Sequence, residues 1–277
     1  MTSRKASSDT FITYYRDRDL PGLEIAMFNA FTHCYPRHVH ERYAIGLMLR
    51  GGSHCLTSSF DEYLVGPGDI ALLHPGRVHT GTPVEQSVPS YIMFYMETAH
   101  MQAAAQEFMQ NSTADVVFPR MVVSRPDVKQ TLMRLYRAVR FKEDRLVKQS
   151  VEAQAMEALF DCAALSPKHS QFDNEPRAIK LVREYLHDHI GEHVTLEDLS
   201  EMVGLSRHHL LRVFSKNTGV SPHQYHVQLR IEHARRLFQR GLSIADVAYE
   251  TGFVDQSHFT KAFKKVIGVT PGQYLSY

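Results

Sequence analysis

IADVAYETGFVDQSHFTKAFKKVIGVTPGQY, residues 244–274, is the stretch that decides the fold, because a related stretch occurs earlier in the chain. LEDLSEMVGL, residues 196–205, aligns with its first ten residues at a shift of 48, and after the glycine the shift becomes 49. The coincident pairs are Leu196/Ile244, Asp198/Asp246, Leu199/Val247, Gly204/Gly252, Leu210/Phe259, Phe214/Phe263, Gly219/Gly268, Val220/Val269, Pro222/Pro271 and Tyr225/Tyr274. A period near 48 with matching apolar, glycine and proline positions predicts two copies of one supersecondary unit.

Each copy has the pattern of a helix-turn-helix. A first amphipathic helix ends at Gly204 or Gly252, because glycine most easily adopts the left-handed conformation of a tight turn. Ser206 and Asp255 are then suited to cap the second helix of each unit. We therefore predict an all-α domain with two helix-turn-helix units over residues 177–277.

The polar face of each predicted second helix carries side chains that can reach base edges in a major groove. Arg212 and Lys261 can donate to guanine or to phosphate, and Gln256 can pair with adenine. A solvated face is the ordinary explanation of one such helix, but it does not explain why the unit occurs twice. The candidate DNA-contacting residues are His208, Leu211, Arg212, Gln256, Ser257, His258, Lys261 and Lys264.

Between the two units, Pro222 to about Arg240 is predicted to form one helix. At ~1.5 Å per residue this helix is roughly 28 Å long, close to the ~34 Å between successive major-groove faces on one side of B-DNA. One chain could then place both second helices in adjacent grooves. The arginines of the joining helix are expected to touch phosphates, and they are Arg230, Arg235, Arg236 and Arg240.

The first half of the chain has a different pattern. From about Leu23 to Glu97, short apolar segments alternate with Gly and Pro turns, which favours a β-barrel or sandwich. Apolar spacing then predicts helices over 127–140 and about 144–165, and SPKHSQFDNEP at 166–176 has the composition of a linker. We expect an α+β protein with a cupin-like barrel at 1–123, a helical dimerisation segment at 124–166, a linker at 167–176 and the DNA-binding domain at 177–277.

The composition limits the classes of function. Of the 277 residues, 43% are hydrophobic and 22% are charged, which is an ordinary globular balance. No apolar run approaches the ~18 residues of a membrane span, and three separated cysteines favour reduced thiols in the cytoplasm. The net charge of +1 argues against a general polyanion binder, although residues 177–277 carry 13 Lys and Arg against 10 Asp and Glu. That local excess has the sign expected for an anionic partner.

The C-terminal pattern resembles the AraC/XylS family of bacterial transcription regulators. The resemblance covers residues 177–277 and is most specific at 244–248, 252–253, 255–259, 263–264 and 268–274. It implies binding to double-stranded DNA, a homodimer formed through the helices after the sensor barrel, and activation by recruiting RNA polymerase. The base-reading positions that it implies are His208, Leu211, Arg212, Gln256, Ser257, His258 and Lys261. The apolar Leu211 departs from the polar reader of some relatives and puts the first unit's contacts in doubt.

Glycine and proline turns flank two histidine motifs in the first half. His38-Val39-His40 and Pro75-Gly76-Arg77-Val78-His79, with Gly51-Gly52 and Gly66-Pro67-Gly68-Asp69 between them, resemble the cupin-like sensor half of the same family. The resemblance implies a small-molecule effector in the barrel. The spacing is also similar to that of metal-binding cupins, where histidines and a carboxylate converge. Those cupins have a Glu four or five residues after the second His, where this chain has Ala44 and Ile45.

Three interpretations of these histidines stay open. They line a small-molecule pocket, which is the favoured interpretation, or form a three-histidine metal site, or only satisfy hydrogen bonds near a barrel mouth. The ligand-binding candidates are His38, His40, Tyr43, Arg77, His79 and Tyr95, and His33, His54 and His74 are expected to be structural. Neither a metal nor another cofactor is expected.

These observations favour a ligand-responsive transcription activator without catalytic residues. A metal-dependent cupin oxygenase or isomerase with a DNA-binding appendix is one alternative, and the missing Glu counts against it. A ligand-independent regulator, whose barrel serves only for dimerisation or protein contacts, is the other. We expect a cytoplasmic protein that has no contact with membranes.

Overall fold

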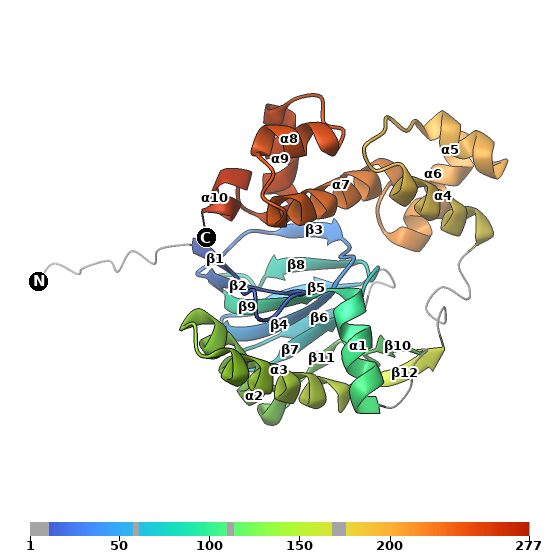
Figure 1. Ribbon diagram of the computed structural model, residues 1–277. Helices are drawn as coiled ribbons and strands as arrows, with labels where there is room; N and C mark the ends of the chain where they lie inside the picture. Colours follow the sequence, from blue (N-terminus) through green and yellow to red (C-terminus); the bar gives the residue numbers. More distant parts are fainter. Residues whose placement is uncertain (1–10, 58–60, 110–113, 168–175, 277) are drawn as a thin grey trace, which may run out of the picture.

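The computed structural model describes residues 11–57, 61–109, 114–167 and 176–276 (Figure 1). The first part of the chain contains β1 (Phe11–Arg16), β2 (Leu23–Asn29), β3 (Tyr35–His38), β4 (Tyr43–Arg50), β5 (Ser53–Leu56), β6 (Glu62–Val65), β7 (Ile70–Leu73), β8 (His79–Pro83), β9 (Ser90–Met96), α1 (Thr98–Met109), β10 (Ala114–Val117), β11 (Val122–Val123), α2 (Pro126–Arg140), α3 (Arg145–Phe160) and β12 (Ala164–Pro167). The second part contains α4 (Arg177–Asp188), α5 (Leu196–Val203), α6 (Arg207–Thr218), α7 (Pro222–Gln239), α8 (Ile244–Glu250), α9 (Gln256–Ile267) and α10 (Pro271–Leu275).

Two antiparallel sheets face each other and form the N-terminal barrel. One sheet has the strand order β1-β2-β9-β4-β7-β11, and the other has the order β3-β8-β5-β6. The predicted α+β class, with strands first and an all-helical C-terminal part, is therefore confirmed. The segments expected as strands between Leu23 and Glu97 correspond to β2, β4, β6, β7 and β9.

Strands β4 and β9 form the centre of the larger sheet, and both of their faces are covered. Because successive side chains on a strand point to opposite faces, Ile45 packs against the outer helices while Gly46 lines the interior. In the same way, Phe94 faces outward and Tyr95 faces inward. The barrel interior is thus one side of a sheet whose other side is fully packed.

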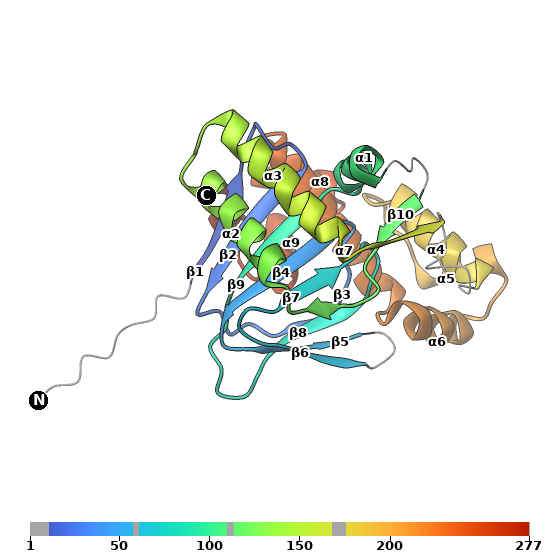
Figure 2. The same cartoon turned by 90° about the horizontal axis from the view of Figure 1, so that it is seen from below.

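Helices α2 and α3 cover the outer face of the larger sheet (Figure 2). The prediction for α2 is confirmed, but the second helix ends at Phe160 and does not continue to Leu165. Residues 164–167 instead form β12, which pairs antiparallel with β10. Strand pairing with a distant segment overrides the local apolar spacing here. Most of the predicted linker, residues 168–175, lies outside the described residues.

The C-terminal part contains the predicted tandem, with α5 and α6 in the first unit and α8 and α9 in the second. The Ser206 side chain accepts a hydrogen bond from the backbone N–H of His209, and the Asp255 side chain accepts one from His258. These are the N-caps expected from the sequence. Gly204, in the turn of the first unit, has a φ of 67°. Helix α7 joins the two units.

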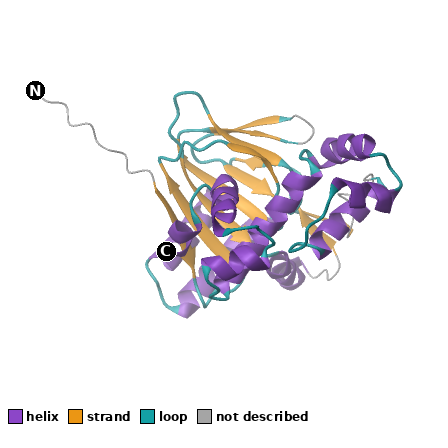
Figure 3. Ribbon diagram, turned by 90° about the horizontal axis from the view of Figure 1, so that it is seen from above, coloured by secondary structure: helices purple, strands orange, loops and turns teal. Residues whose placement is uncertain are grey.

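Helix α7 lies along the barrel, on the side away from α2 and α3 (Figure 1, Figure 3). The backbone N–H of Val39 donates to the side chain of Gln228 on this helix over 3.2 Å. The Tyr35 hydroxyl donates to the carbonyl of Ile267 at the end of α9, also over 3.2 Å. The barrel therefore contacts both the joining helix and the second helix-turn-helix unit. Among the described residues, no helix is long and apolar enough to cross a membrane.

Candidate functional site

All eight residues that were predicted to contact DNA are exposed on the second helices of the two units. In α6, Leu210 and Phe214 point into the core, so His208, Leu211 and Arg212 lie outward. In α9, Phe259 and Phe263 are buried in the same way, so the opposite face of the helix points outward. Gln256, Ser257, His258, Lys261 and Lys264 occupy that outer face.

The charges of these two helices have a single sign. Helix α6 carries Arg207, Arg212 and Lys216, helix α9 carries Lys261, Lys264 and Lys265, and neither contains Asp or Glu. Cationic side chains on exposed helices are suited to contact phosphates as well as base edges. The arrangement is therefore compatible with DNA contact by both units.

The barrel lies beside one of these helices. His258, Lys261 and Lys265 of α9 border a groove whose opposite wall is formed by residues 35–38 of β3 and includes Gln228 of α7. Lys261 is thus exposed to solvent but lies beside the barrel.

Arg235 of α7 is buried against the barrel and cannot reach a phosphate in this arrangement. It is 2% exposed and donates to Glu24 of β2, to Glu232 over 3.1 Å and to the Tyr274 hydroxyl over 3.2 Å. Burial raises the pKa of the Glu24 carboxyl, but Arg235 and two further arginines outweigh that effect and hold this pKa below its ordinary value. Arg235 is therefore part of a buried ionic network, and the expected phosphate contact is wrong for it.

Two more arginines of α7 serve structural contacts. Arg230 donates to three backbone carbonyls, those of Ile190, Glu192 and Gly252. Arg236 lies 3.4 Å from the carboxylate of Glu41 in the barrel. The phosphate contact expected for Arg230 is therefore wrong in this arrangement. The side chain of Arg236 is 40% exposed and Arg240 at the C-cap is exposed, so their phosphate contacts stay predictions.

The barrel contains a partly open cavity of about 130 Å³ that residues of both halves line. Its aromatic wall consists of Tyr14, Phe28, Phe31, Tyr35, Tyr91 and Tyr95, and its histidines are His33, His38, His40 and His79. Helices α7 and α9 contribute Gln228, Glu232, Arg235, Val266 and Ile267. Apolar walls with a few convergent polar groups are the composition of a small-molecule site.

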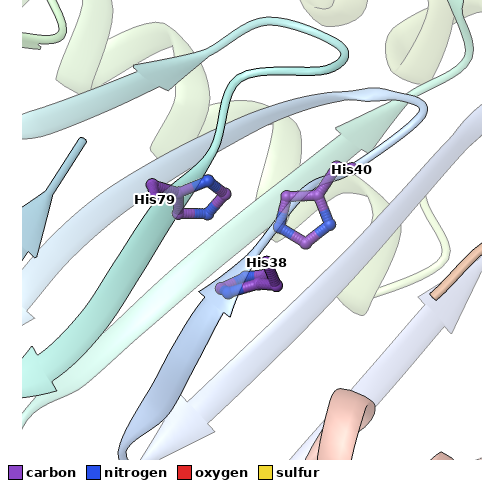
Figure 4. Close-up of side chains that lie close together, drawn as sticks. All are labelled: His38, His40 and His79. Carbon is purple, nitrogen blue, oxygen red and sulfur yellow. The ribbon is translucent and has the colours of Figure 1, made fainter. Parts of the chain in front are cut away.

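Three of the histidines form a cluster, and their rings turn toward one another (Figure 4). Ring centroids lie 4.2 Å apart for His38 and His79, 4.9 Å for His38 and His40, and 5.1 Å for His40 and His79. Burial lowers the pKa of each ring. The three imidazoles are therefore neutral near pH 7 and keep lone pairs that can accept hydrogen bonds or bind a cation.

Four of the six predicted ligand-binding residues line the cavity, namely His38, His40, His79 and Tyr95. Tyr43 does not line the cavity. Its neighbour Ala44 pairs with Tyr95 and shares the inner face of the sheet, so Tyr43 points to the outer face. Its side chain faces the helices, and its hydroxyl donates to the carbonyl of Val116 over 2.8 Å. Arg77 is not among the lining residues either, although its backbone carbonyl contacts the His79 ring.

The sequence reasoning missed several lining residues. His33 was expected to be structural but borders the cavity, and its Nε2 is buried without a hydrogen-bond partner in the described structure. Tyr91 could have been inferred from its four-residue spacing to Tyr95 on one strand, because an even spacing places both side chains on the same face. No sequence signal pointed to Glu232 or Arg235, because they come from the other half of the chain.

Comparisons with known proteins agree with this architecture. Residues 21–161 match the family model described as an AraC-like ligand-binding domain, and residues 199–277 match a helix-turn-helix domain. The HTH-type transcriptional regulator YbfI of Bacillus subtilis is 32% identical over 240 residues, which cover 85% of each chain. YisR of the same organism is 24% identical and covers 82% of this chain and 84% of its own length.

Solved structures share the fold over nearly the whole chain. The regulator ToxT from Vibrio cholerae superposes with a TM-score of 0.54 at 15% identity and covers 96% of this chain and 98% of its own. At this identity the likeness concerns the fold alone. The two matched domains and the full-length relatives establish that this chain belongs to the AraC family of transcription regulators, with an N-terminal ligand-binding domain and a C-terminal helix-turn-helix DNA-binding domain.

Proposed function

We propose that a small molecule in the barrel cavity controls how the barrel holds the DNA-binding domain, and thereby controls transcription. The observation that carries this proposal is the shared lining of the cavity. Glu232 and Arg235 of α7 and Ile267 of α9 border the same space as the barrel residues. A ligand there contacts both halves, and it shifts their arrangement to the extent that it binds the docked and undocked states differently.

The route from the cavity to the joining helix is short. The Arg235 guanidinium lies 4.8 Å from the centre of the Tyr95 ring, and Tyr95 in turn contacts His40 edge to face at 5.6 Å. Displacement of Tyr95 by a ligand would therefore alter the environment of Arg235 directly. Arg235 also donates to Glu24 of the barrel, so the same displacement bears on the contact that joins the two halves.

The cavity limits the size of the effector. At about 130 Å³ it is close to the ~150 Å³ of a protein cavity that accommodates benzene. The effector class that fits is a molecule of about one ring that carries polar groups, since tyrosine hydroxyls and imidazoles alternate with apolar walls. In this proposal the barrel binds its small molecule without converting it, so the protein is not an enzyme.

The DNA contacts are assigned to the exposed faces of α6 and α9, that is, to His208, Leu211, Arg212, Gln256, Ser257, His258, Lys261 and Lys264. Release of α9 from the groove beside β3 would give the second unit full access to DNA. Such a ligand-promoted release favours activation, with recruitment of RNA polymerase in the cytoplasm as the output. The two units would occupy adjacent major grooves.

A homodimer is part of this proposal. Phe141, Leu146 and Val147, at the turn between α2 and α3 and the start of α3, are 66%, 75% and 40% exposed. Apolar side chains gathered on one exposed end of a helical pair are suited to pack against a second copy. The helices themselves rest on the rigid outer face of the sheet, which would hold such an interface in place.

The experiment combines thermal unfolding with DNA binding. A small-molecule panel is screened against the whole chain, because a ligand at ~100 times its dissociation constant stabilises by ~2.7 kcal/mol. Binding to fragments of the gene's own upstream region is then measured by fluorescence anisotropy with and without each hit. We expect an affinity change of ~5–150-fold.

Two variants make this test specific. Ala71→Phe fills the cavity from its floor and should abolish the response, whereas Tyr43→Phe, which faces the outer helices, should keep it. If every stabilising ligand left the DNA affinity unchanged, the barrel would not control DNA binding and the proposal would fail.

A further inference from the structure

The hydrogen bonds of the histidine cluster fix which ring nitrogens carry protons. Nδ1 of His38 lies 2.8 Å from the carbonyl of Pro36, and Nδ1 of His79 lies 3.0 Å from the carbonyl of Arg77. A carbonyl oxygen only accepts, so each Nδ1 carries the proton and donates it. Each Nε2 is then left with a lone pair.

These lone pairs have no partner within the part of the chain that the structure describes. The only hydrogen bond of the His38 ring is the one to Pro36, that of the His79 ring is the one to Arg77, and the His40 ring makes none. His38 is 9% exposed and His79 is 5% exposed. All three rings line the cavity, so these lone pairs are accessible to a ligand that enters it.

We propose that His38, His40 and His79 bind a divalent first-row transition-metal ion, with the remaining coordination positions open to the cavity. One ring nitrogen of each histidine lies within 4.8 Å of those of the other two. Two nitrogens bound to one zinc ion at ~2.0–2.1 Å in tetrahedral geometry lie ~3.4 Å apart. Binding of one ion would therefore bring these nitrogens closer together by up to ~1.4 Å.

The chemistry of the donors selects the class of ion. Imidazole nitrogens suit Zn²⁺, Ni²⁺, Co²⁺ or Fe²⁺, whereas Mg²⁺ and Ca²⁺ prefer oxygen ligands. The carbonyl bonds on Nδ1 match the outer-shell pattern that fixes metal-binding histidines. Arg42 and Arg235 lie near His40, but each is paired with Glu232, so their charges are partly offset.

The position of this site joins it to the DNA-binding domain. Two of the three ligands, His38 and His40, flank Val39, whose backbone N–H donates to Gln228 of α7. The same Gln228 side chain donates to the carbonyl of Arg37 over 3.4 Å. An ion that draws His38 and His40 toward His79 thus acts on the segment that α7 holds. The metal site stands on the geometry of the barrel, and only its effect on DNA binding rests on the function proposed above.

The test is a titration of the whole, chelator-treated protein with Co²⁺, followed by visible absorption and by equilibrium dialysis. We expect one Co²⁺ per chain, with the absorption of a low-symmetry nitrogen site. His79→Ala and His40→Gln should lose the absorption and the bound ion. His33→Ala, which removes a cavity histidine outside the cluster, should keep both.

Circular dichroism spectra of the variants establish that they are folded, and the conservative His40→Gln variant guards against loss of structure. Two outcomes would overturn the proposal. One is a wild-type protein that binds no Co²⁺. The other is binding that persists unchanged in His79→Ala and His40→Gln, which would assign the ion to other histidines among the 17 in the chain. Neither readout involves DNA, so failure of the metal site and failure of the proposed function are distinguishable.

Discussion

Arg235, on the helix that joins the two helix-turn-helix units, donates to Glu24, on the second strand of the barrel. Both side chains are almost fully buried, at 2% and 1% exposed. A buried charge without a partner is strongly unfavourable. Removal of either partner of this interdomain ion pair is therefore expected to lower the stability of the protein.

The first prediction concerns this contact. Glu24→Gln leaves Arg235, Arg42 and Arg16 with an excess of buried positive charge, so we expect the free energy of unfolding to fall by ~3–5 kcal/mol. Chemical denaturation of the whole chain measures the change. Glu62→Gln, at a position that is 57% exposed, is the control and should cost less than ~1 kcal/mol. Equal losses in the two variants would contradict the assignment.

The second prediction concerns DNA. Lys261→Ala and Arg212→Ala should each weaken binding to the specific site by ~1–3 kcal/mol if these side chains read bases. Anisotropy titrations against the specific fragment and a random one provide the measurement, with Lys129→Ala on exposed barrel helix α2 as the control. An equal loss on both fragments would identify phosphate contacts instead of base contacts.

The third prediction separates backbone strain from domain contact. Gly204 and Gly219 both have positive φ, 67° and 72°, so alanine at either position carries a backbone cost of ~1–2 kcal/mol. A Cβ at Gly204 meets nothing within 4 Å, but one at Gly219 would lie 2.6 Å from Cγ1 of Val78 in the barrel. Of the two variants, we expect only Gly219→Ala to separate the domains and so increase the radius of gyration in small-angle X-ray scattering. A radius unchanged from that of Gly204→Ala would show that the barrel tolerates the added methyl group.

The fourth prediction concerns metal and DNA together. Linkage requires that the factor by which Co²⁺ changes the affinity for DNA equals the factor by which DNA changes the affinity for Co²⁺. Paired titrations of the wild-type protein measure both factors, and we expect them to lie in the range of ~5–150-fold. In His79→Ala the DNA affinity should not respond to Co²⁺. A response that survives this substitution would place the coupling elsewhere.

The fifth prediction concerns pH. His226 is buried in the C-terminal domain, and its Nε2 donates to the carbonyl of His189 over 3.1 Å. Burial lowers its pKa from 6.5 to about 4. Because the folded pKa lies below the unfolded one, protonation favours unfolding. The stabilising contribution is present above pH 6.5 and declines as the pH falls to 4, by roughly 3 kcal/mol for this shift.

His226→Gln keeps a donor for the His189 carbonyl but does not titrate. Denaturation midpoints of the wild-type protein and this variant, measured between pH 7 and 4, should therefore differ in slope, with the variant falling less steeply. Parallel curves would assign the pH dependence to other groups, of which His74, with a pKa also lowered to about 4 by burial, is one.

The sequence predicts the C-terminal domain well because the evidence is local. The glycine turns and the N-caps at Ser206 and Asp255 depend on a few neighbouring residues, and the repeat supplies each of them twice. For these turns and caps, the short-range pattern and the final structure depend on the same interactions. The convergence of His38, His40 and His79 was instead implied by the resemblance of their motifs to those of cupins.

The remainder depends on contacts between distant segments. Arg235 has the spacing of a residue on a polar helix face, and nothing local distinguishes a face that meets DNA from one that meets a barrel. Tyr43 was placed in the cavity because a one-residue difference in register decides the face of a strand. The predicted C-terminal end of α3 was wrong because the residues after it form β12, which pairs with β10. Helical spacing carries no information about such a partner.

Gly219 and Gly268 are equivalent positions of the two repeats, and both lie against the barrel. A Cβ at Gly268 would be 2.7 Å from the Tyr35 hydroxyl, much as one at Gly219 would meet Val78. The C-terminal ends of α6 and α9 therefore both pack against the barrel. In the docked protein, α6 and α9 are held at a fixed separation by the barrel as well as by α7. In the released state that we propose for DNA binding, α7 alone would set that separation, so the docked and released proteins would differ in the spacing of half-sites that they can span.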